Sequence, residues 1–443
     1  MIQKIVKRDG KVVDFNPEKI TFAVFQAAIA VGGRDKAMAD SISREVVRQL
    51  EARSFEKSYP TVEEVQDLVE KCLIEEGHAK TAKAYILYRY EHSLKRAGQK
   101  SLAYSSDNVP YEKLWQALNW AFDHRCVTLD DLSQIIENKS YEKLIADSES
   151  FYQQEIQRAV NVLMNQLENL RAIIVAGPSS SGKTTTSLKI AAALKQKGYR
   201  LKTMAIDNYF FDLNTHPKDS DGDYDFETPQ AIDLELLNSH FKDLLAGKSI
   251  KVPYYNFKKG CREGSAGEMN LGARDILLID SLHGLHSDLT SAIAGDEKLK
   301  IYVETLAQLK NAKGRFVRWS DIRMMRRMVR DKQFRNYNPV QTLTHWHYVR
   351  RSELRYIISK LQSANIVLNT YLPYEVPLLV NRLRNYLAAF EKDLAEKPHH
   401  YDALERFERL KDLFAQVPVY TDENRVPKQS LLREFIGGSD LSY

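Results

Sequence analysis

The feature that most constrains the fold is a glycine-rich loop, GPSSSGKT at residues 177–184, which lies between two segments of different character. The five residues before it, 172–176, are apolar and predict a buried strand. The residues after it, up to Gly198, predict a helix. Glycines in such a loop let backbone N–H groups face a phosphate at the helix N-terminus. The pattern therefore predicts a phosphate-binding loop within an α/β fold.

Two side chains at the start of this helix carry the expected chemistry. Lys183 places a cation toward the β- and γ-phosphates of a nucleotide, and the Thr184 hydroxyl is a ligand for Mg²⁺. The alternative is a fortuitous glycine–serine turn, which the strand–loop–helix context disfavours. The residues expected to contact ATP are Gly177, Ser179, Ser180, Ser181, Gly182, Lys183, Thr184 and Thr185.

Apolar strands alternate with helices through the second half of the chain. The predicted strands are residues 172–177, 201–207, 275–280, 298–304 and 364–368, with a long polar loop between the second and the third. Continuous apolar strands of this kind favour a parallel sheet with helices on both faces. The C-terminal residues are expected to form helices that complete or brace this domain.

Two aspartates end predicted strands, where open α/β sheets bind their ligands. Asp207 follows the second strand and is a candidate to accept the proton of an attacking hydroxyl. Asp280 ends the third strand and is a candidate metal ligand. For both residues, an aspartate that only caps the following loop is the alternative.

A helix predicted at residues 321–335 is rich in arginine. Spacings of four and three residues place Arg323, Arg327 and Arg330 on one face. Such a cluster can neutralise a transferring phosphoryl group. A solvated basic face or a nucleic-acid contact is the alternative, but the phosphate loop favours a lid over the nucleotide.

The first 96 residues predict a small helical domain. Asp9 and Gly10 lie between two β-prone runs and indicate a hairpin. Helical patterns follow, and Thr61 with Glu64 has the spacing of a capping box. Residues 97–150 predict a helical connector without an assigned role, and residues 151–443 form the domain that carries the phosphate loop.

Composition excludes several classes of protein. A chain of 443 residues with 43% hydrophobic and 28% charged residues is neither disordered nor fibrous. Three widely spaced cysteines support neither a disulfide framework nor a paired-cysteine zinc site. A formal charge of +5 does not require a nucleic-acid partner. Because no apolar run approaches the ~20 residues of a membrane span, we expect a soluble, cytoplasmic protein without a membrane partner.

Beyond residue 172 the chain resembles the uridine kinase and phosphoribulokinase family, through motifs such as GPSSSGKTTTS, IDNYF, VPYYNF, LLIDSLHGLH, RRMVRD and LLREFIGGSD. The resemblance implies that Asp207 is the general base and that Glu227 holds ribose hydroxyls. It also implies that Tyr255 and Arg262 lie on the acceptor side. Lid arginines that contact phosphate are implied at Arg327, Arg330 and Arg335.

Two positions depart from the family pattern. Gly260 stands where uridine-cytidine kinases have a histidine that contacts the base, so selectivity for pyrimidines is not supported. Asp280 and Ser281 stand where the family has a glutamate and a glycine, which shortens the carboxylate next to the metal.

Residues 2 to about 92 resemble the ATP-cone, a nucleotide-sensing module of ribonucleotide reductases and of a repressor of their genes, through IVKRDGKVVDF and AYILYRY. By that resemblance Lys7, Arg8 and Lys19 face nucleotide phosphates; surface lysines on a hairpin are the alternative. Length and cysteine count exclude the reductase and the zinc-ribbon repressor.

Together these observations predict an ATP- and Mg²⁺-dependent kinase of a nucleoside hydroxyl, adjusted by ATP or dATP at the N-terminal domain. A nucleotide-sensing regulator without catalysis and a kinase of a sugar phosphate are the alternatives. Cone domains often act through association, so a homo-oligomer is compatible with this prediction.

Overall fold

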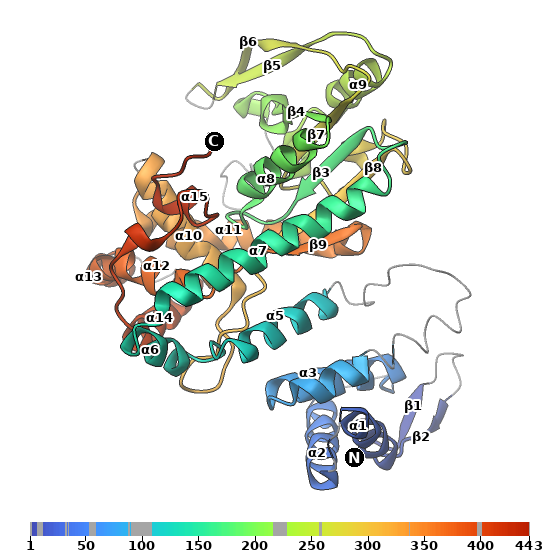
Figure 1. The fold of residues 1–443 in the computed structure, drawn as a ribbon, viewed down its shortest axis with the longest axis vertical. Helices are drawn as coiled ribbons and strands as arrows, with labels where there is room; N and C mark the ends of the chain where they lie inside the picture. Colours follow the sequence, from blue (N-terminus) through green and yellow to red (C-terminus); the bar gives the residue numbers. More distant parts are fainter. Residues whose placement is uncertain are drawn as a thin grey trace. The chain divides into compact units, whose positions relative to one another are not determined.

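The computed structural model of the chain consists of two compact units, residues 1–103 and 104–443, which are described separately (Figure 1). Together the two units place most of the sequence in helices and strands. The residues that the structure describes are 2–6, 12–31, 33, 35–52, 59–86, 89, 109–215, 228–256, 259–335, 337–396 and 401–442.

The first unit is a short hairpin with helices. Its elements are strands β1 (Lys4–Val6) and β2 (Val12–Asp14) and helices α1 (Glu18–Ala30), α2 (Lys36–Glu51) and α3 (Val62–Glu75), and residues 79–86 are also helical. The predicted capping box forms, because the Thr61 hydroxyl accepts the Glu64 N–H and the Glu64 carboxylate accepts the Thr61 N–H. Apolar faces of the three helices, including Val24, Ile42 and Leu68, pack into one core.

A five-stranded parallel sheet organises the second unit, as predicted. Its strands, in spatial order, are β4 (Arg200–Ala205), β7 (Asp275–Ser281), β3 (Ala172–Ala176), β8 (Lys298–Glu304) and β9 (Ile366–Asn369). Strand β3 is fully buried at the centre of the sheet, so the loop that follows it lies between neighbouring strand ends. The fold is therefore α/β, with the phosphate loop at the carboxyl edge of a parallel sheet.

Helices surround this sheet (Figure 1). Helices α7 and α8 pack against each other, and α8 contacts β3, β4 and β7. The longer helices of the second unit are α5 (Tyr111–Asp123), α6 (Leu129–Glu137), α7 (Tyr141–Met164), α8 (Lys183–Gln196), α9 (Leu234–Leu245), α10 (Trp319–Arg335), α11 (Pro339–Ser352), α12 (Glu375–Leu383), α13 (Leu387–Glu396) and α14 (Tyr401–Gln416), followed by the short α15 (Arg433–Ile436). Helices α5 and α6, from the predicted connector, belong to this unit.

The segment expected to be a long polar loop contains regular structure. It includes α9 and an antiparallel hairpin of β5 (Ile250–Asn256) and β6 (Cys261–Met269). Leu237, Phe241 and Leu244 of α9 pack into a core with β3, β4 and β7. Their spacing of four and three residues is a helical signal that the polar residues between them obscure.

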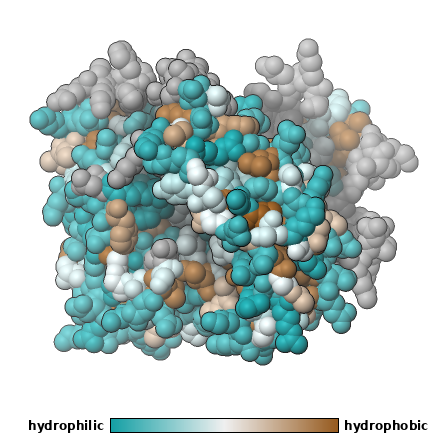
Figure 2. Space-filling view, turned by 90° about the horizontal axis from the view of Figure 1, so that it is seen from above, coloured by the Kyte–Doolittle hydropathy of each residue, from teal (hydrophilic) through white to brown (hydrophobic). Residues whose placement is uncertain are grey.

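On the face seen in Figure 2, hydrophilic residues predominate and hydrophobic residues form small separate groups. Among the described residues, no helix is long and apolar enough to cross a membrane.

Candidate active site

Both glycines of the phosphate loop are required by close contacts and by backbone geometry. Gly177 has φ 156°, and a Cβ atom there would lie 2.2 Å from the Val303 carbonyl oxygen. Gly182 has φ 87°, and a Cβ atom there would lie 2.5 Å from Leu431. A side chain at either position would clash and strain the backbone.

Two buried arginines of α10 hold the loop from one side. Arg323 donates to the Ser179 carbonyl at 3.1 Å, and Arg326 donates to the Ser180 carbonyl at 3.4 Å. Because N–H and C=O point in opposite directions in a trans peptide, the Ser180 N–H points away from Arg323, whereas the Ser181 N–H donates to the Pro178 carbonyl at 3.3 Å. In the described part of the chain, the buried hydroxyls of Ser180 and Ser181 have no hydrogen-bond partner. The loop therefore presents donors that suit a phosphate.

Lys183 and Thr184 lie beside Asp280. The Lys183 ammonium donates to the Pro178 carbonyl at 3.0 Å, and the Thr184 hydroxyl donates to the Asp280 carboxylate at 3.4 Å. Burial raises the pKa of Asp280 to about 6, although Lys183 opposes the shift. Burial also lowers the pKa of Lys183, against the attraction of Asp280 and Glu434. Burial therefore leaves the charges of both groups poorly solvated.

Asp207 lies at the same edge of the sheet. Ala205 of β4 pairs with Asp280 of β7, and Asp207 follows two residues later. The Asp207 side chain is exposed to solvent at its surface. The protein that surrounds it nevertheless desolvates the carboxylate and so raises its pKa, while Lys183 and Arg335 act to lower it. A carboxylate with a raised pKa is a stronger base than a solvated aspartate.

The arginines of α10 divide into two groups, which differs from the expected single face. Arg323 forms ion pairs with Glu304 at 2.8 Å and with Glu353 at 2.5 Å. Arg326 forms a bidentate pair with Glu375, at 2.6 and 2.8 Å. Buried carboxylates therefore neutralise these two arginines, and Arg323 is not part of a lid.

The other three arginines gather around Asp331. Arg327 donates to Asp331 at 3.3 Å and to the Ser179 hydroxyl at 3.2 Å. Arg330 and Arg335 pair with Asp331 at 2.8 and 3.6 Å. One buried carboxylate thus faces three cations next to the phosphate loop, which leaves net positive charge for an anionic ligand.

Tyr255 and Arg262 are cross-strand neighbours in the β5–β6 hairpin. The Tyr255 N–H donates to the Asn208 side chain at 3.1 Å, which ties the hairpin to the residue after Asp207. Arg262 pairs with Asp233 at 2.9 Å. These contacts bring the two predicted acceptor-side residues together. The third, Glu227, lies outside the described residues.

In the first unit, Lys19 is exposed at the start of α1. Just before this helix, the side chain of Asn16 accepts the Glu18 N–H at 2.8 Å. Lys7 and Arg8 lie outside the described residues. The structure therefore locates one of the three cations predicted to bind a nucleotide in this unit.

Two acidic residues of the site were not predicted. Asp331 lies one turn after Arg327 on α10, and its i, i+4 spacing was a usable signal. Glu434 reaches Thr185 from a segment 249 residues away, and no local pattern indicates such a contact.

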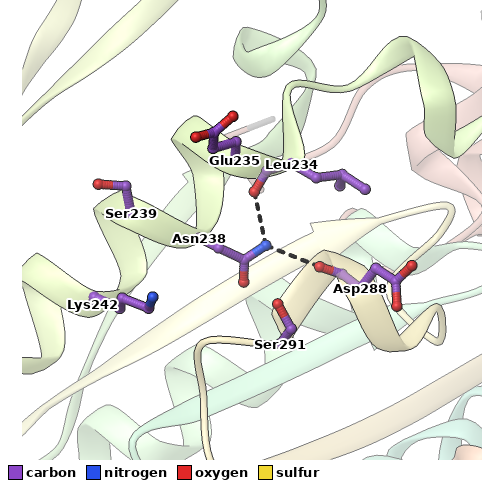
Figure 3. A pocket seen from close by; sticks show the side chains of 7 residues that line it. All are labelled: Leu234, Glu235, Asn238, Ser239, Lys242, Asp288 and Ser291. Carbon is purple, nitrogen blue, oxygen red and sulfur yellow. Dashed lines mark hydrogen bonds between the residues drawn. The ribbon is translucent and has the colours of Figure 1, made fainter.

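A separate depression of about 460 Å³ lies between α9 and the loop after β7 (Figure 3). The Asn238 side chain donates to the carbonyls of Leu234 and Asp288 and accepts the Ala292 N–H at 2.9 Å. These bonds join α9 to the loop. None of the predicted site residues lines this depression, which is formed by Leu234, Glu235, Asn238, Ser239, Lys242, Asp288 and Ser291.

Comparison with known families agrees with this geometry. Residues 172–375 match the phosphoribulokinase/uridine kinase family, and residues 3–94 match the ATP cone domain. The chain combines an ATP cone domain with a phosphoribulokinase/uridine kinase domain. The family match begins at β3 and includes the phosphate loop, both strand-end aspartates and α10.

The kinase-family domain is similar to curated uridine kinases. The chain is 29% identical over 160 residues to the uridine kinase of Halobacterium salinarum, which covers 36% of this chain and 62% of that protein. It is 27% identical over 195 residues to the uridine kinase of Deinococcus deserti, with 44% and 84% covered. The match thus spans less than two thirds of the length of the first of these relatives. It also aligns with the structure of a possible uridine kinase from Bacillus stearothermophilus, at 13% identity and a TM-score of 0.34, covering 49% of this chain and 98% of that one.

Proposed function

We propose that this protein transfers the γ-phosphoryl group of ATP to a hydroxyl of a nucleoside. The observation that carries the proposal is the meeting of Lys183, Asp207 and Asp280 at adjacent strand ends. A nucleotide-binding regulator needs the phosphate loop but has no use for a base on the acceptor side. The similarity to uridine kinases supports a nucleoside as the acceptor.

In the proposed mechanism, the cations offset charge on the phosphoryl group. Lys183 and the lid arginines Arg327, Arg330 and Arg335 would supply the positive charge next to the phosphates. Asp207 orients the acceptor hydroxyl and takes its proton as the new P–O bond forms and the bond to ADP breaks. Its raised pKa favours that transfer, and its accessibility lets a substrate reach it.

The residues around Thr184 suit Mg²⁺. A threonine hydroxyl and the Asp280 carboxylate, 3.4 Å apart, are hard oxygen ligands of the kind that Mg²⁺ prefers. Within the described ranges, no group of three or more His, Cys, Asp or Glu side chains forms a metal cage. Asp280 and Thr184 would hold the ion together with water and phosphates. Bound there, Mg²⁺ supplies charge neutralisation at the β- and γ-phosphates.

The acceptor is proposed to lie between Asp207 and the β5–β6 hairpin. Tyr255 and Arg262 are proposed to contact the acceptor, and Glu227 is proposed to hold ribose hydroxyls. A Cβ atom at Gly260 would lie 2.9 Å from Leu213, so the hairpin packs tightly where a base-contacting side chain would start. Glycine has no side chain that could contact a base at this position, and a sugar phosphate is the alternative acceptor.

Regulation by ATP or dATP is proposed for the first unit. Its match to the ATP cone domain supports a nucleotide effector, with Lys7, Arg8 and Lys19 as the cations that hold its phosphates. Lys19 is exposed beside a helix N-terminus, where an anion is stabilised.

The test is phosphoryl transfer from ATP to a panel of nucleosides and sugar phosphates. Transfer to a nucleoside that disappears in both Lys183→Ala and Asp207→Asn supports the proposal. Transfer only to sugar phosphates moves the acceptor to that class, and transfer to none with ATP still bound refutes the kinase. A second series with dATP, repeated in Lys19→Ala, tests the effector site without altering the catalytic unit.

A further inference from the structure

A carboxylate of the C-terminal segment reaches into the phosphate loop. Glu434, on the short helix α15, accepts the Thr185 N–H at 3.2 Å and the Thr185 hydroxyl at 2.6 Å. Burial lowers the pKa of Lys183 and raises that of Asp280, and the charge of Glu434 opposes the first shift and adds to the second. Glu434 is therefore in electrostatic contact with the residues proposed to hold the donor nucleotide.

The N–H that Glu434 accepts belongs to the anion-binding end of α8. This helix starts at Lys183, and its first backbone bond runs from the Thr186 N–H to the Gly182 carbonyl. The Thr185 N–H therefore precedes the first intrahelical bond and points out of the helix end. Phosphate loops direct such N–H groups at nucleotide phosphates. Glu434 thus occupies a donor that a phosphate would use.

Glu434 does not lie on a loose tail. Leu431 packs directly on Gly182, and the Ser430 hydroxyl bonds to Tyr374 at 2.8 Å. Arg433 donates to the carbonyls of Glu423 and Val426, at 2.8 and 2.7 Å. The backbone of α15 is therefore fixed beside the loop, and only the partly exposed Glu434 side chain is placed to turn away.

We propose that Glu434 competes with the donor nucleotide for the Thr185 amide and so sets the affinity of the phosphate loop for ATP. This rests on the proposed function, because it takes ATP as the ligand of the loop. In the free protein the carboxylate stabilises the helix end as a bound anion does. When ATP binds, Glu434 releases Thr185, because a carboxylate and a phosphate repel each other at one donor.

If Glu434 competes with ATP, its replacement should strengthen ATP binding and lower the stability of the free protein. Glu434→Gln removes the charge and keeps the side-chain shape, so we expect ATP to bind about three- to tenfold more tightly. The same variant loses the anion at the helix end, so its melting temperature without nucleotide falls. Glu434→Ala strengthens both changes. Asp440→Asn, a matched loss of charge in an exposed part of the same segment, leaves both quantities unchanged.

Calorimetric titration of the full chain with MgATP measures the affinity, and Lys183→Ala identifies the component due to the phosphate loop, apart from the cone. Weaker or unchanged ATP binding in Glu434→Gln overturns the inference, because a merely structural role lowers stability without tightening binding. If Lys183→Ala leaves all ATP binding intact, the loop does not bind ATP and the proposed function falls with the inference. If only the Glu434 variants fail to respond, the inference alone falls.

Discussion

The two halves of the arginine cluster on α10 have similar sequences but different surroundings. Arg323 and Arg326 are buried, paired with carboxylates, and bonded to carbonyls of the phosphate loop. Arg327 and Arg330 share one aspartate beside the loop. The first pair shapes the loop, while the second leaves positive charge for a ligand. A run of arginines can therefore serve as support and as binding site within one helix.

The largest expected effect comes from the supporting half. Arg326→Met leaves Glu375 buried without its partner, which we expect to lower the free energy of unfolding by about 3 to 5 kcal/mol. Urea denaturation followed by tryptophan fluorescence reports this change. All four tryptophans lie in the second unit, so the signal is specific to it.

The double variant Arg326→Met/Glu375→Leu separates stability from loop shape. It removes the buried charge, so most of the stability returns. The Ser180 carbonyl still lacks its donor, so ATP binding remains weaker than in the parent protein. A loss below about 1 kcal/mol in the single variant would contradict the supporting role of Arg326.

The ligand-facing half is expected to show the reverse pattern. Arg327→Met removes a cation beside the loop, but the buried Asp331 keeps Arg330 and Arg335 as partners, so stability changes little. The rate of phosphoryl transfer falls about 100-fold, or roughly 2.7 kcal/mol. Steady-state kinetics measure the loss, and Arg351→Met on the exposed surface of α11 is the control. Equal rates in both variants would remove Arg327 from the proposed lid.

Asp280, the carboxylate next to Lys183, is expected to make the stability of the protein depend on pH. The folded pKa of Asp280, about 6, lies above its ordinary value of 3.8, so ionisation destabilises the fold. This loss of stability is absent below about pH 4, grows as the pH rises through the folded pKa of about 6 and is complete well above it. We expect Asp280→Asn to be more stable than the parent by about 1 to 3 kcal/mol at pH 8 and equal to it at pH 4.

Thermal unfolding of the free protein at the two pH values measures this difference, and transfer activity is lost in the same variant. Equal stability at both values would show that Asp280 is compensated in the free protein, like Glu353, where burial raises the pKa but Arg323 and Arg350 together leave it lowered.

The smallest expected effect is at the residue that joins the lid arginines. Asp331→Asn keeps the side-chain size but removes the charge that holds Arg327, Arg330 and Arg335 together. The arginines become less ordered, so we expect kcat to fall about three- to tenfold. A faster variant would mean that Asp331 restrains the lid instead of ordering it.

Local patterns predicted much of this molecule. The apolar runs located all five strands of the parallel sheet, and the loop between 177 and 184 was recognised from its glycines and its context. Asp207 and Asp280 were singled out because strand ends meet at one edge, and their side chains do interact. Helix α9 and the β5–β6 hairpin were missed, since polar residues and a proline interrupt their periodicity.

The sequence by itself determined the strands, the phosphate loop and the two strand-end aspartates, because each depends on neighbours in the chain. Only the tertiary structure decided which arginines are neutralised and where Glu434 lies. Glu375 is 49 residues from Arg326 and Glu434 is 249 from Thr185, so their pairing depends on how the helices pack. Coulomb interactions act through space. The spacing of arginines within one helix therefore does not reveal which carboxylate from another part of the chain will pair with each of them.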